Sequence, residues 1–155
     1  MAVPVFAAAK RLCERAEWSL SNLKLQKLLY IAHLFYLGES NGNPLLREHF
    51  EAWDYGPVQP DLYRSVRIFG SSPIENIFHF ADDISEGSPE AKIIDSAALQ
   101  LGKAASSRLV AITHWDKGAW ARNYRPGVRG VIIPNDDILR EYRDRVNASN
   151  HARPV

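Results

Sequence analysis

Histidine is the side chain best suited to acid–base and metal chemistry near neutral pH, and the 155-residue chain carries five of them. They are His33, His49, His79, His114 and His151. Hydrolytic zinc sites commonly use two histidines four residues apart on a helix, and that spacing does not occur. A metal-dependent or His/Asp hydrolase assembled from distant segments is kept as an alternative hypothesis. Its candidate residues are His33, Asp54, His114 and Asp116.

Nucleophilic catalysis has no clearer signature in this sequence. The one cysteine, Cys13, lies on the apolar side of the first predicted helix, where cysteine usually acts as a small hydrophobic residue. No Gly-x-Ser-x-Gly turn and no glycine-rich phosphate loop occurs. We therefore expect a protein that is not an enzyme, with no catalytic residue and no bound metal or cofactor.

The composition is that of an ordinary globular protein, with 46% hydrophobic and 24% charged residues. A formal net charge of +1 gives no general attraction to nucleic acid or to an anionic membrane. The first residues, MAVPVFAAAKRLCERAE, place the basic groups after the apolar run, which is the reverse of a secretory signal. No apolar stretch is long enough to span a bilayer, and the single cysteine fits a reducing compartment. These features predict a cytoplasmic protein.

Charge is distributed unevenly along the chain. Residues 75–95 are mostly acidic, whereas residues 122–145 contain six arginines among four acidic residues. One interpretation is that they are opposite ends of one surface, with the arginine-rich end facing an acidic partner. The other is that both are solvated loop and helix surfaces, as charge runs usually are.

Aromatic and basic residues alternate in WDKGAWARNYRPGVR, residues 115–129. Nucleic-acid binding by such a segment is a further alternative, because basic residues bind phosphates and aromatic rings stack on bases. Core aromatics flanked by cations that reach the solvent explain the same pattern. We favour that second interpretation, since no helix-turn-helix signature accompanies the segment.

The strongest helical pattern is LKLQKLLYIAHLFYLGE, which begins after a capping Ser21 or Asn22. One apolar face consists of Leu25, Leu28, Leu29, Ala32 and Phe35, and further apolar residues occupy the other sides. A helix that is apolar on nearly every side is enclosed by its neighbours. The polar residues that remain, Gln26, Tyr30 and His33, fall on one face.

Shorter elements are expected around this central helix. The patterns predict helices over residues 4–15, 60–69, 89–102, 106–115 and 118–125, and a last helix from Asn135 or Asp136 to Val146. Strands are predicted within residues 47–55 and 131–133. The predicted fold is mainly α: a single compact helical domain, residues 1–146, with a small two- or three-stranded β-ribbon. Residues 147–155 are expected to form a flexible C-terminal tail.

The stretch FEAWDYGPVQPDLY, residues 50–63, combines aromatic, acidic, glycine and proline residues just before a predicted helix. Gly56 and Pro57 set the direction of a turn, and Asp54 is placed to accept a bond from its backbone. Such a stretch fixes a strand against a helix. The same residues also suit a shallow aromatic pocket for a peptide of a partner, so both interpretations stay open.

Three motifs together resemble the Panacea domain, the family of SocA-like antitoxins and a phage-associated protein group. They are KLQKLLY at residues 24–30, Ala52-Trp53 with GPVxPxxY at residues 56–63, and Thr113-His114 followed by Trp120. The similarity extends over roughly residues 5–146. It implies an antitoxin of a bacterial or phage toxin–antitoxin system, which binds and neutralises a cognate protein toxin. The resemblance also suggests a proteolytic adaptor, and a Clp-type protease would then be a second partner.

The resemblance also implies a division of the chain into framework and partner-facing surface. The expected framework residues are Lys24, Gln26, Lys27, Tyr30, Trp53, Tyr55, Gly56, Pro57, Pro60, Tyr63, Thr113, His114 and Trp120. They are expected to hold the central helix to the β-ribbon through buried hydrogen bonds. The expected partner-facing residues are Asp82, Asp83, Glu86, Arg122, Arg125, Arg129, Arg140 and Arg143.

Overall fold

The structure is a computed structural model that describes residues 1–152, with side chains described as far as Ser149. Its helices are α1 (Val5–Arg15), α2 (Asn22–Glu39), α3 (Pro60–Val66), α4 (Pro89–Leu101), α5 (Ser106–Thr113), α6 (Ala119–Asn123) and α7 (Asn135–Ala152), and a 3-10 helix, η1 (Arg67–Phe69), follows α3. The strands are β1 (Phe50–Trp53), β2 (Gly56–Val58) and β3 (Ile132–Ile133). The predicted fold class, a single mainly α domain with a small β-ribbon, is confirmed.

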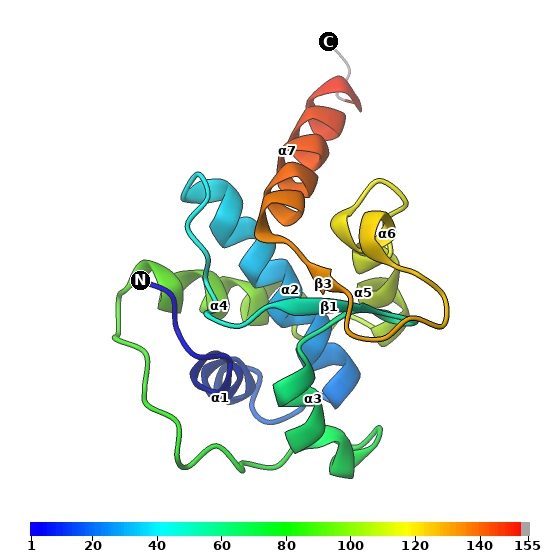
Figure 1. Ribbon diagram of the computed structural model, residues 1–155. Helices are drawn as coiled ribbons and strands as arrows, with labels where there is room; N and C mark the ends of the chain where they lie inside the picture. The colour runs from blue at the N-terminus through cyan, green and yellow to red at the C-terminus, as the bar shows by residue number, and fades with distance from the viewer. Residues whose placement is uncertain (153–155) are drawn as a thin grey trace.

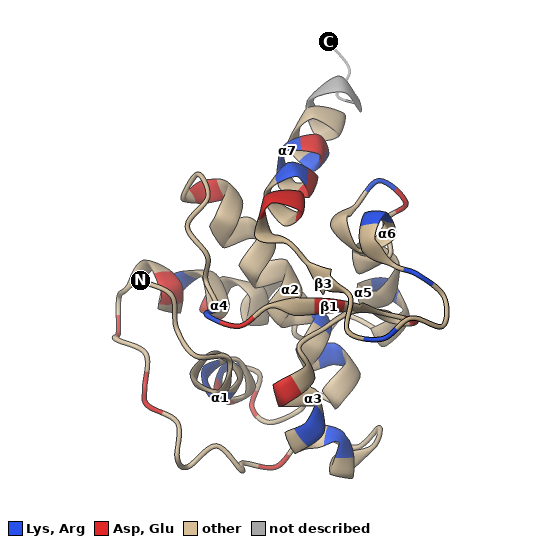
Figure 2. Ribbon diagram, viewed as in Figure 1, with Lys and Arg blue, Asp and Glu red and all other residues tan. Residues whose placement is uncertain are grey.

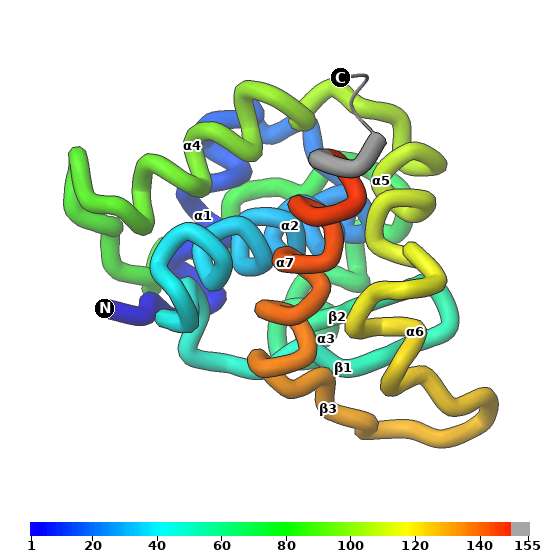
Figure 3. Tube along the Cα trace, turned by 90° about the horizontal axis from the view of Figure 1, so that it is seen from above, coloured from blue at the N-terminus to red at the C-terminus, as the bar shows by residue number. Residues whose placement is uncertain are grey.

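Helix α2 runs through the middle of the molecule, and α1, α4, α5 and α7 pack around it (Figures 1 and 3). The Ser21 hydroxyl caps it by accepting a bond from the Lys24 backbone N–H, one of the groups that a helix end leaves unpaired. The buried face contains Leu25, Leu28, Leu29 and Ala32, as predicted. Phe35 departs from the prediction. It is 44% exposed, because its ring lies against Tyr142 of α7 at the edge of the core.

The sheet has three antiparallel strands in the order β2–β1–β3. Strands β1 and β2 form a hairpin in which Trp53 pairs with Gly56, and β3 adds to β1 with Ile133 opposite Phe50. Phe50 and Ile133 are both buried, and the Phe50 ring packs edge-on against Tyr30 of α2 at 5.3 Å between centroids. A slip by one residue would move these side chains to the other face of the sheet, so their burial against α2 fixes the register.

The segment between η1 and α4, residues 70–88, has no regular secondary structure but is anchored to the core. Ile74, Phe78 and Ile84 are buried along it. The Phe78 ring stacks on Trp18 with 6.4 Å between centroids. Apolar residues at these intervals tie the acidic segment to the neighbourhood of α1, so it is not a free loop.

Helix α7 is longer than the sequence predicts. It continues from Asn135 to Ala152, past Val146, and its C-terminal end extends away from the other helices (Figure 1). Residues 147–152 of the predicted tail are therefore helical, and residues 153–155 lie outside the described residues. Whether the tail is flexible stays a prediction. No helix in the described part of the chain is long and apolar enough to cross a membrane.

A close contact between Gly38 and Tyr142 holds α7 against α2. Gly38 lies inside α2, and a methyl group added there would overlap the ring carbons of Tyr142. The ring itself also packs edge-on against Phe35, at 5.9 Å between centroids. Glycine normally weakens a helix relative to alanine, so its presence here is explained by the space that the tyrosine ring needs.

We predict that Gly38→Ala destabilises the protein, although helix propensity alone favours alanine by about 1 kcal/mol. Overpacking against the Tyr142 ring should lower the free energy of unfolding by about 1–3 kcal/mol, measured by urea denaturation. In a Tyr142→Ala background the ring is absent, and the same glycine substitution should be neutral or stabilising. Equal destabilisation in the two backgrounds would show that the ring does not set the requirement for glycine.

Candidate functional site

The polar face of α2 is buried and each of its side chains binds a different part of the chain. Gln26 is 2% exposed and forms two hydrogen bonds with the Gln59 backbone. Gln26 Nε2 donates to the Gln59 carbonyl at 3.2 Å, and the Gln59 N–H donates to Gln26 Oε1 at 2.7 Å. The Gln59 side chain in turn caps α3 by accepting from the Leu62 N–H at 2.8 Å. Gln26 therefore fixes the point where β2 gives way to α3.

Tyr30 binds a buried carboxylate on the last helix. Its hydroxyl donates to Glu141 Oε1 at 2.7 Å, and Glu141 is 1% exposed. The same carboxylate accepts from the Ala119 N–H at 2.9 Å and from Arg145 Nε at 2.8 Å. Burial, and then the Glu141 charge, raise the pKa of Tyr30, so the phenol stays protonated as a donor. One carboxylate thus joins α2, α6 and α7.

His33 joins α2 to the chain on either side of the sheet. Its Nδ1 accepts from the Leu46 backbone N–H at 3.2 Å, which leaves the proton on Nε2 to donate to Asn135 Oδ1 at 2.9 Å. The ring is fully buried, and this burial lowers its pKa to about 4. His33 is accordingly neutral near pH 7 and acts as a structural connector at the start of α7.

Lys27 lies beneath the β1–β2 corner and is fully buried. Its ammonium donates to the Pro57 carbonyl at 3.0 Å, and no carboxylate among the described residues pairs with it. Burial lowers the pKa of Lys27 to about 8. Gly56 has a φ of +112°, and a Cβ there would lie 3.2 Å from the Lys27 amine and 3.0 Å from His114, so the corner requires glycine.

Three stacked rings cover this corner. His114 stacks on Trp120 with 3.9 Å between centroids, and Tyr124 also stacks on Trp120, at 4.8 Å. The Trp120 indole donates to the Trp53 carbonyl at 2.6 Å, and the Tyr124 hydroxyl donates to Asp54. Asp54 therefore accepts from a distant tyrosine instead of the backbone of its own turn. The stack ties α6 to the end of the β1–β2 hairpin.

His114 Nε2 is buried and has no hydrogen-bond partner among the described residues. Burial lowers the pKa of His114, the charge of Lys27 lowers it further, and the Tyr55 backbone acts in the opposite direction. The neutral form of the His114 ring is therefore favoured beside the buried Lys27 ammonium. The Thr113 hydroxyl next to it is used within α5, where it donates to the Leu109 carbonyl at 3.0 Å.

The remaining framework residues differ in burial. Pro57 and Pro60 are buried, and Lys24, Trp53 and Tyr63 are half-buried. The Trp53 and Tyr63 rings meet edge-on at 4.8 Å, and the Trp53 indole donates to Glu51 Oε1 at 3.0 Å. Tyr55 corrects the prediction of buried hydrogen bonds, because it is 74% exposed at the hairpin turn, where its side chain points away from the core.

The residues of the hydrolase alternative are not brought together. His33 binds Asn135 and His114 stacks on Trp120, whereas Asp54 binds Tyr124 and Asp116 is exposed. Among the described residues, no group of three or more His, Cys, Asp or Glu is placed to hold a metal ion. Cys13 is fully buried, and burial raises its pKa to about 12, which keeps the thiol protonated. No observation favours the hydrolase.

The acidic segment predicted to face a partner is mostly paired within the chain. Lys10 binds Asp83 at 3.0 Å, and Arg11 binds Glu86 at 3.0 Å and Asp95 at 2.7 Å. The side chain of Arg11 is 9% exposed, so these carboxylates fix a nearly buried guanidinium between α1 and α4. Asp82 is exposed at the surface. For Asp83 and Glu86, the partner that the structure shows is internal.

The predicted partner-facing arginines are all exposed, and they differ in their partners. Arg122 approaches Asp144 at 3.7 Å, and Arg143 donates to Asn41 Oδ1 at 2.8 Å. Arg125 donates to the Arg122 and Tyr124 carbonyls, within its own turn. Arg129 and Arg140 form no ion pair with a carboxylate in the described part of the chain.

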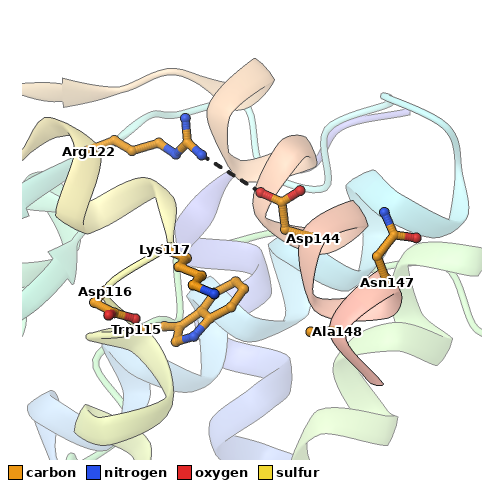
Figure 4. Close-up of a pocket in the computed structure, with 7 residues that line it drawn as sticks. All are labelled: Trp115, Asp116, Lys117, Arg122, Asp144, Asn147 and Ala148. Atoms are coloured by element: carbon orange, nitrogen blue, oxygen red, sulfur yellow. Dashed lines mark ion pairs between the residues drawn. The ribbon is translucent and has the colours of Figure 1, made fainter. Parts of the chain in front are cut away.

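An open cleft lies between the α5–α6 connection and α7, with a volume of about 500 Å³. Its lining residues are Trp115, Asp116, Lys117, Arg122, Asp144, Asn147 and Ala148 (Figure 4). Arg145 covers the Trp115 ring at 4.7 Å from its centroid. Positive and negative groups are balanced in this cleft, so it has no clear charge preference for a ligand.

The role of Glu141 is not predicted by the sequence, in which it is only one of the acidic residues of the last segment. Two signals point to it. A buried tyrosine on a central helix needs an acceptor for its hydroxyl, and Glu141 follows Ile138 by three residues on the inward face of α7. Neither signal selects a partner across the whole chain, because the pairing depends on how α7 folds back over α2.

The comparison with protein families identifies the class to which this fold and polar network belong. The family model for the SocA-like antitoxin Panacea domain matches residues 25–121. The chain therefore belongs to the SocA-like Panacea domain family. Every predicted framework residue except Lys24 lies inside the matched span.

A curated relative gives a more particular likeness. The chain is similar to Antitoxin SocA of Caulobacter vibrioides (strain NA1000 / CB15N), with 37% identity over 116 residues. The similar region is 65% of this chain and 58% of the relative, so the chain spans somewhat more than half the length of that protein. No solved structure matches the chain.

We predict that Lys27→Met removes a component of the pH dependence of stability. Between about pH 8 and 10.5, Lys27 binds fewer protons in the folded state than in the unfolded state, so the free energy of unfolding rises with pH across this range. From pH 7 to 9.5 the wild type should gain about 2 kcal/mol relative to the variant. At pH 7 the variant should be the more stable protein, because it buries no unpaired charge.

Urea denaturation of both proteins at several pH values measures this difference. Subtracting the two curves cancels the other titrating groups, including the tyrosines. A difference in stability that stays constant from pH 7 to 9.5 would show that the Lys27 pKa is not lowered by burial. Lys103→Met serves as the matched control, because Lys103 is exposed.

Proposed function

We propose that this protein is an antitoxin that binds and neutralises a cognate protein toxin, without catalysis of its own. The observation that carries the proposal is the family match over residues 25–121, which includes the buried polar face of α2, the hairpin corner, and His114 and Trp120 of the ring stack. The relative that bears the name Antitoxin SocA points in the same direction. We place the activity in the cytoplasm.

The geometry supports binding more than chemistry. The conspicuous polar side chains of α2 each have a partner inside the fold, and the candidate catalytic residues lie apart from one another. Their role is to hold one rigid arrangement of helices and hairpin. Such a framework presents a preorganised surface, which lowers the entropic cost of binding a partner.

The finer mechanism that we propose is delivery of the toxin to a Clp-type protease, with this protein as the adaptor. Binding alone suffices for neutralisation, so the adaptor step is a separate claim. Removal of the antitoxin or of the protease should then lengthen the half-life of the toxin. An unchanged half-life would leave direct inhibition by binding as the mechanism.

We predict that the product of the neighbouring gene arrests growth when it is expressed alone, and that co-expression with this protein restores growth. The two proteins should co-purify through a tag on either one. Lys103→Ala, at an exposed position, is the control that should retain both properties. Gly56→Val should lose both, because a side chain at this φ of +112° is strained and meets His114. A harmless neighbour that does not co-purify would contradict the proposal.

A further inference from the structure

The loop between α6 and β3 carries positive charge that the fold does not neutralise. Arg125 and Arg129 lie on it, and neither forms an ion pair with a carboxylate of the described residues. The loop itself contains no acidic residue, and Figure 2 shows only basic and uncharged positions along it. This contrasts with the acidic segment, where Asp83 and Glu86 are paired with cations of α1.

Three carboxylates near the loop have bonds to groups other than the loop arginines. Asp54 accepts from Tyr124, Asp137 accepts from the Asn123 amide at 3.0 Å, and Asp144 pairs with Arg122. None of the three forms an ion pair with Arg125 or Arg129, although only Asp144 is paired with a cation, because the phenol and amide donors are neutral. Arg125 and Arg129 therefore place two cations without an ion pair within four residues of one loop, and Arg140 of α7 is a third such arginine.

Exposed apolar side chains accompany the charge. Val128 is 54% exposed and Ile132 is 51% exposed, on the same short segment as the arginines. We call Arg125, Val128, Arg129 and Ile132 the loop face. Apolar groups beside unpaired arginines are a combination that protein interfaces favour, since arginine is enriched there and the apolar area supplies affinity.

The loop face has a rigid support. Tyr124, the residue before it, stacks on Trp120 at 4.8 Å, and the Trp120 indole is bonded to the Trp53 carbonyl at 2.6 Å. At its other end Ile133 is buried, and β3 pairs with β1. A loop anchored firmly at both ends loses less conformational entropy when a partner binds.

The position of the loop face in the chain also separates it from the shared framework. The family model ends at residue 121, so all four residues lie outside the matched span, whereas the acidic segment lies inside it. A surface that determines which partner is bound belongs in a part of the chain that the common framework does not include.

We propose that the loop face is the surface that binds the toxin, and that it fits an acidic segment of that protein with an apolar residue between its carboxylates. The inference rests on the proposed function. Arg125 and Arg129 would pair with the carboxylates, and Val128 and Ile132 would contact the apolar side chain. The acidic segment of this chain, residues 75–90, is then part of the scaffold.

Nucleic acid is the competing occupant of a basic loop, and the geometry favours protein. The Trp120 ring already stacks with two rings of this chain, His114 and Tyr124, which compete with a base for it. Two loop arginines on a chain of net formal charge +1 supply few phosphate contacts.

The test is charge reversal on the loop face, with the purified product of the neighbouring gene as the probe. Arg129→Glu and the double variant Arg125→Glu/Arg129→Glu should weaken binding by about tenfold or more at low salt, and less at high salt. Matched reversals at Arg67 and Lys103, which are exposed elsewhere, should change the affinity by less than about twofold. Circular dichroism and melting temperature verify that the variants fold, which is expected because Arg129 is exposed.

Equal binding by the wild type and the folded double variant overturns the proposal that the loop face binds the toxin, but it leaves the proposed function intact. No binding by the wild type overturns the proposed function, and this inference with it. Retention of the wild type on single-stranded RNA that disappears in Arg129→Glu assigns the face to nucleic acid and overturns binding of an acidic protein segment. Restored affinity after a toxin carboxylate is exchanged for lysine in the Arg129→Glu complex supports it most strongly.

Discussion

The structure depends on a helix that is enclosed on nearly all sides and yet carries buried polar side chains. Helix α2 buries Gln26, Lys27, Tyr30 and His33, and an unpaired polar group at such depth costs several kcal/mol in a typical protein. Gln26 is bonded to the β2–α3 junction, Lys27 to the hairpin corner and Tyr30 to the middle of α7. His33 is bonded to the segment before β1 and to the start of α7. The positions of these neighbours around α2 are therefore specified by hydrogen bonds as well as by packing.

This arrangement separates the framework from the surface that we propose for binding. The ring stack of His114, Trp120 and Tyr124 attaches the start of the following loop to the hairpin and to α2. The position of that loop is therefore fixed by the framework. Partner choice can then vary on that loop without disturbing the core. The polar motifs that suggest an active site in the sequence act instead as connections between elements.

Local chemistry made most of the fold predictable from the sequence. Ser21 caps α2 and Pro60 opens α3 through short-range rules, and the apolar periodicity identified the central helix. What could not be predicted depends on tertiary position. Phe35 fits the apolar face of α2 by spacing, but it lies at the edge where α7 crosses, and Glu141 becomes the acceptor for Tyr30 only when α7 folds over α2. Likewise, only the packing of α1 on α4 shows that Glu86 is neutralised by Arg11.

A pair of substitutions at Glu141 tests most directly whether the polar face of α2 is architectural. Glu141→Ala removes the acceptor of Tyr30, Ala119 and Arg145, and the free energy of unfolding should fall by about 3 kcal/mol, with a smaller loss for Glu141→Gln. Under conditions where each variant is folded, its affinity for the product of the neighbouring gene should equal that of the wild type. A Glu141→Ala protein that keeps full stability but no longer binds that product would contradict this account.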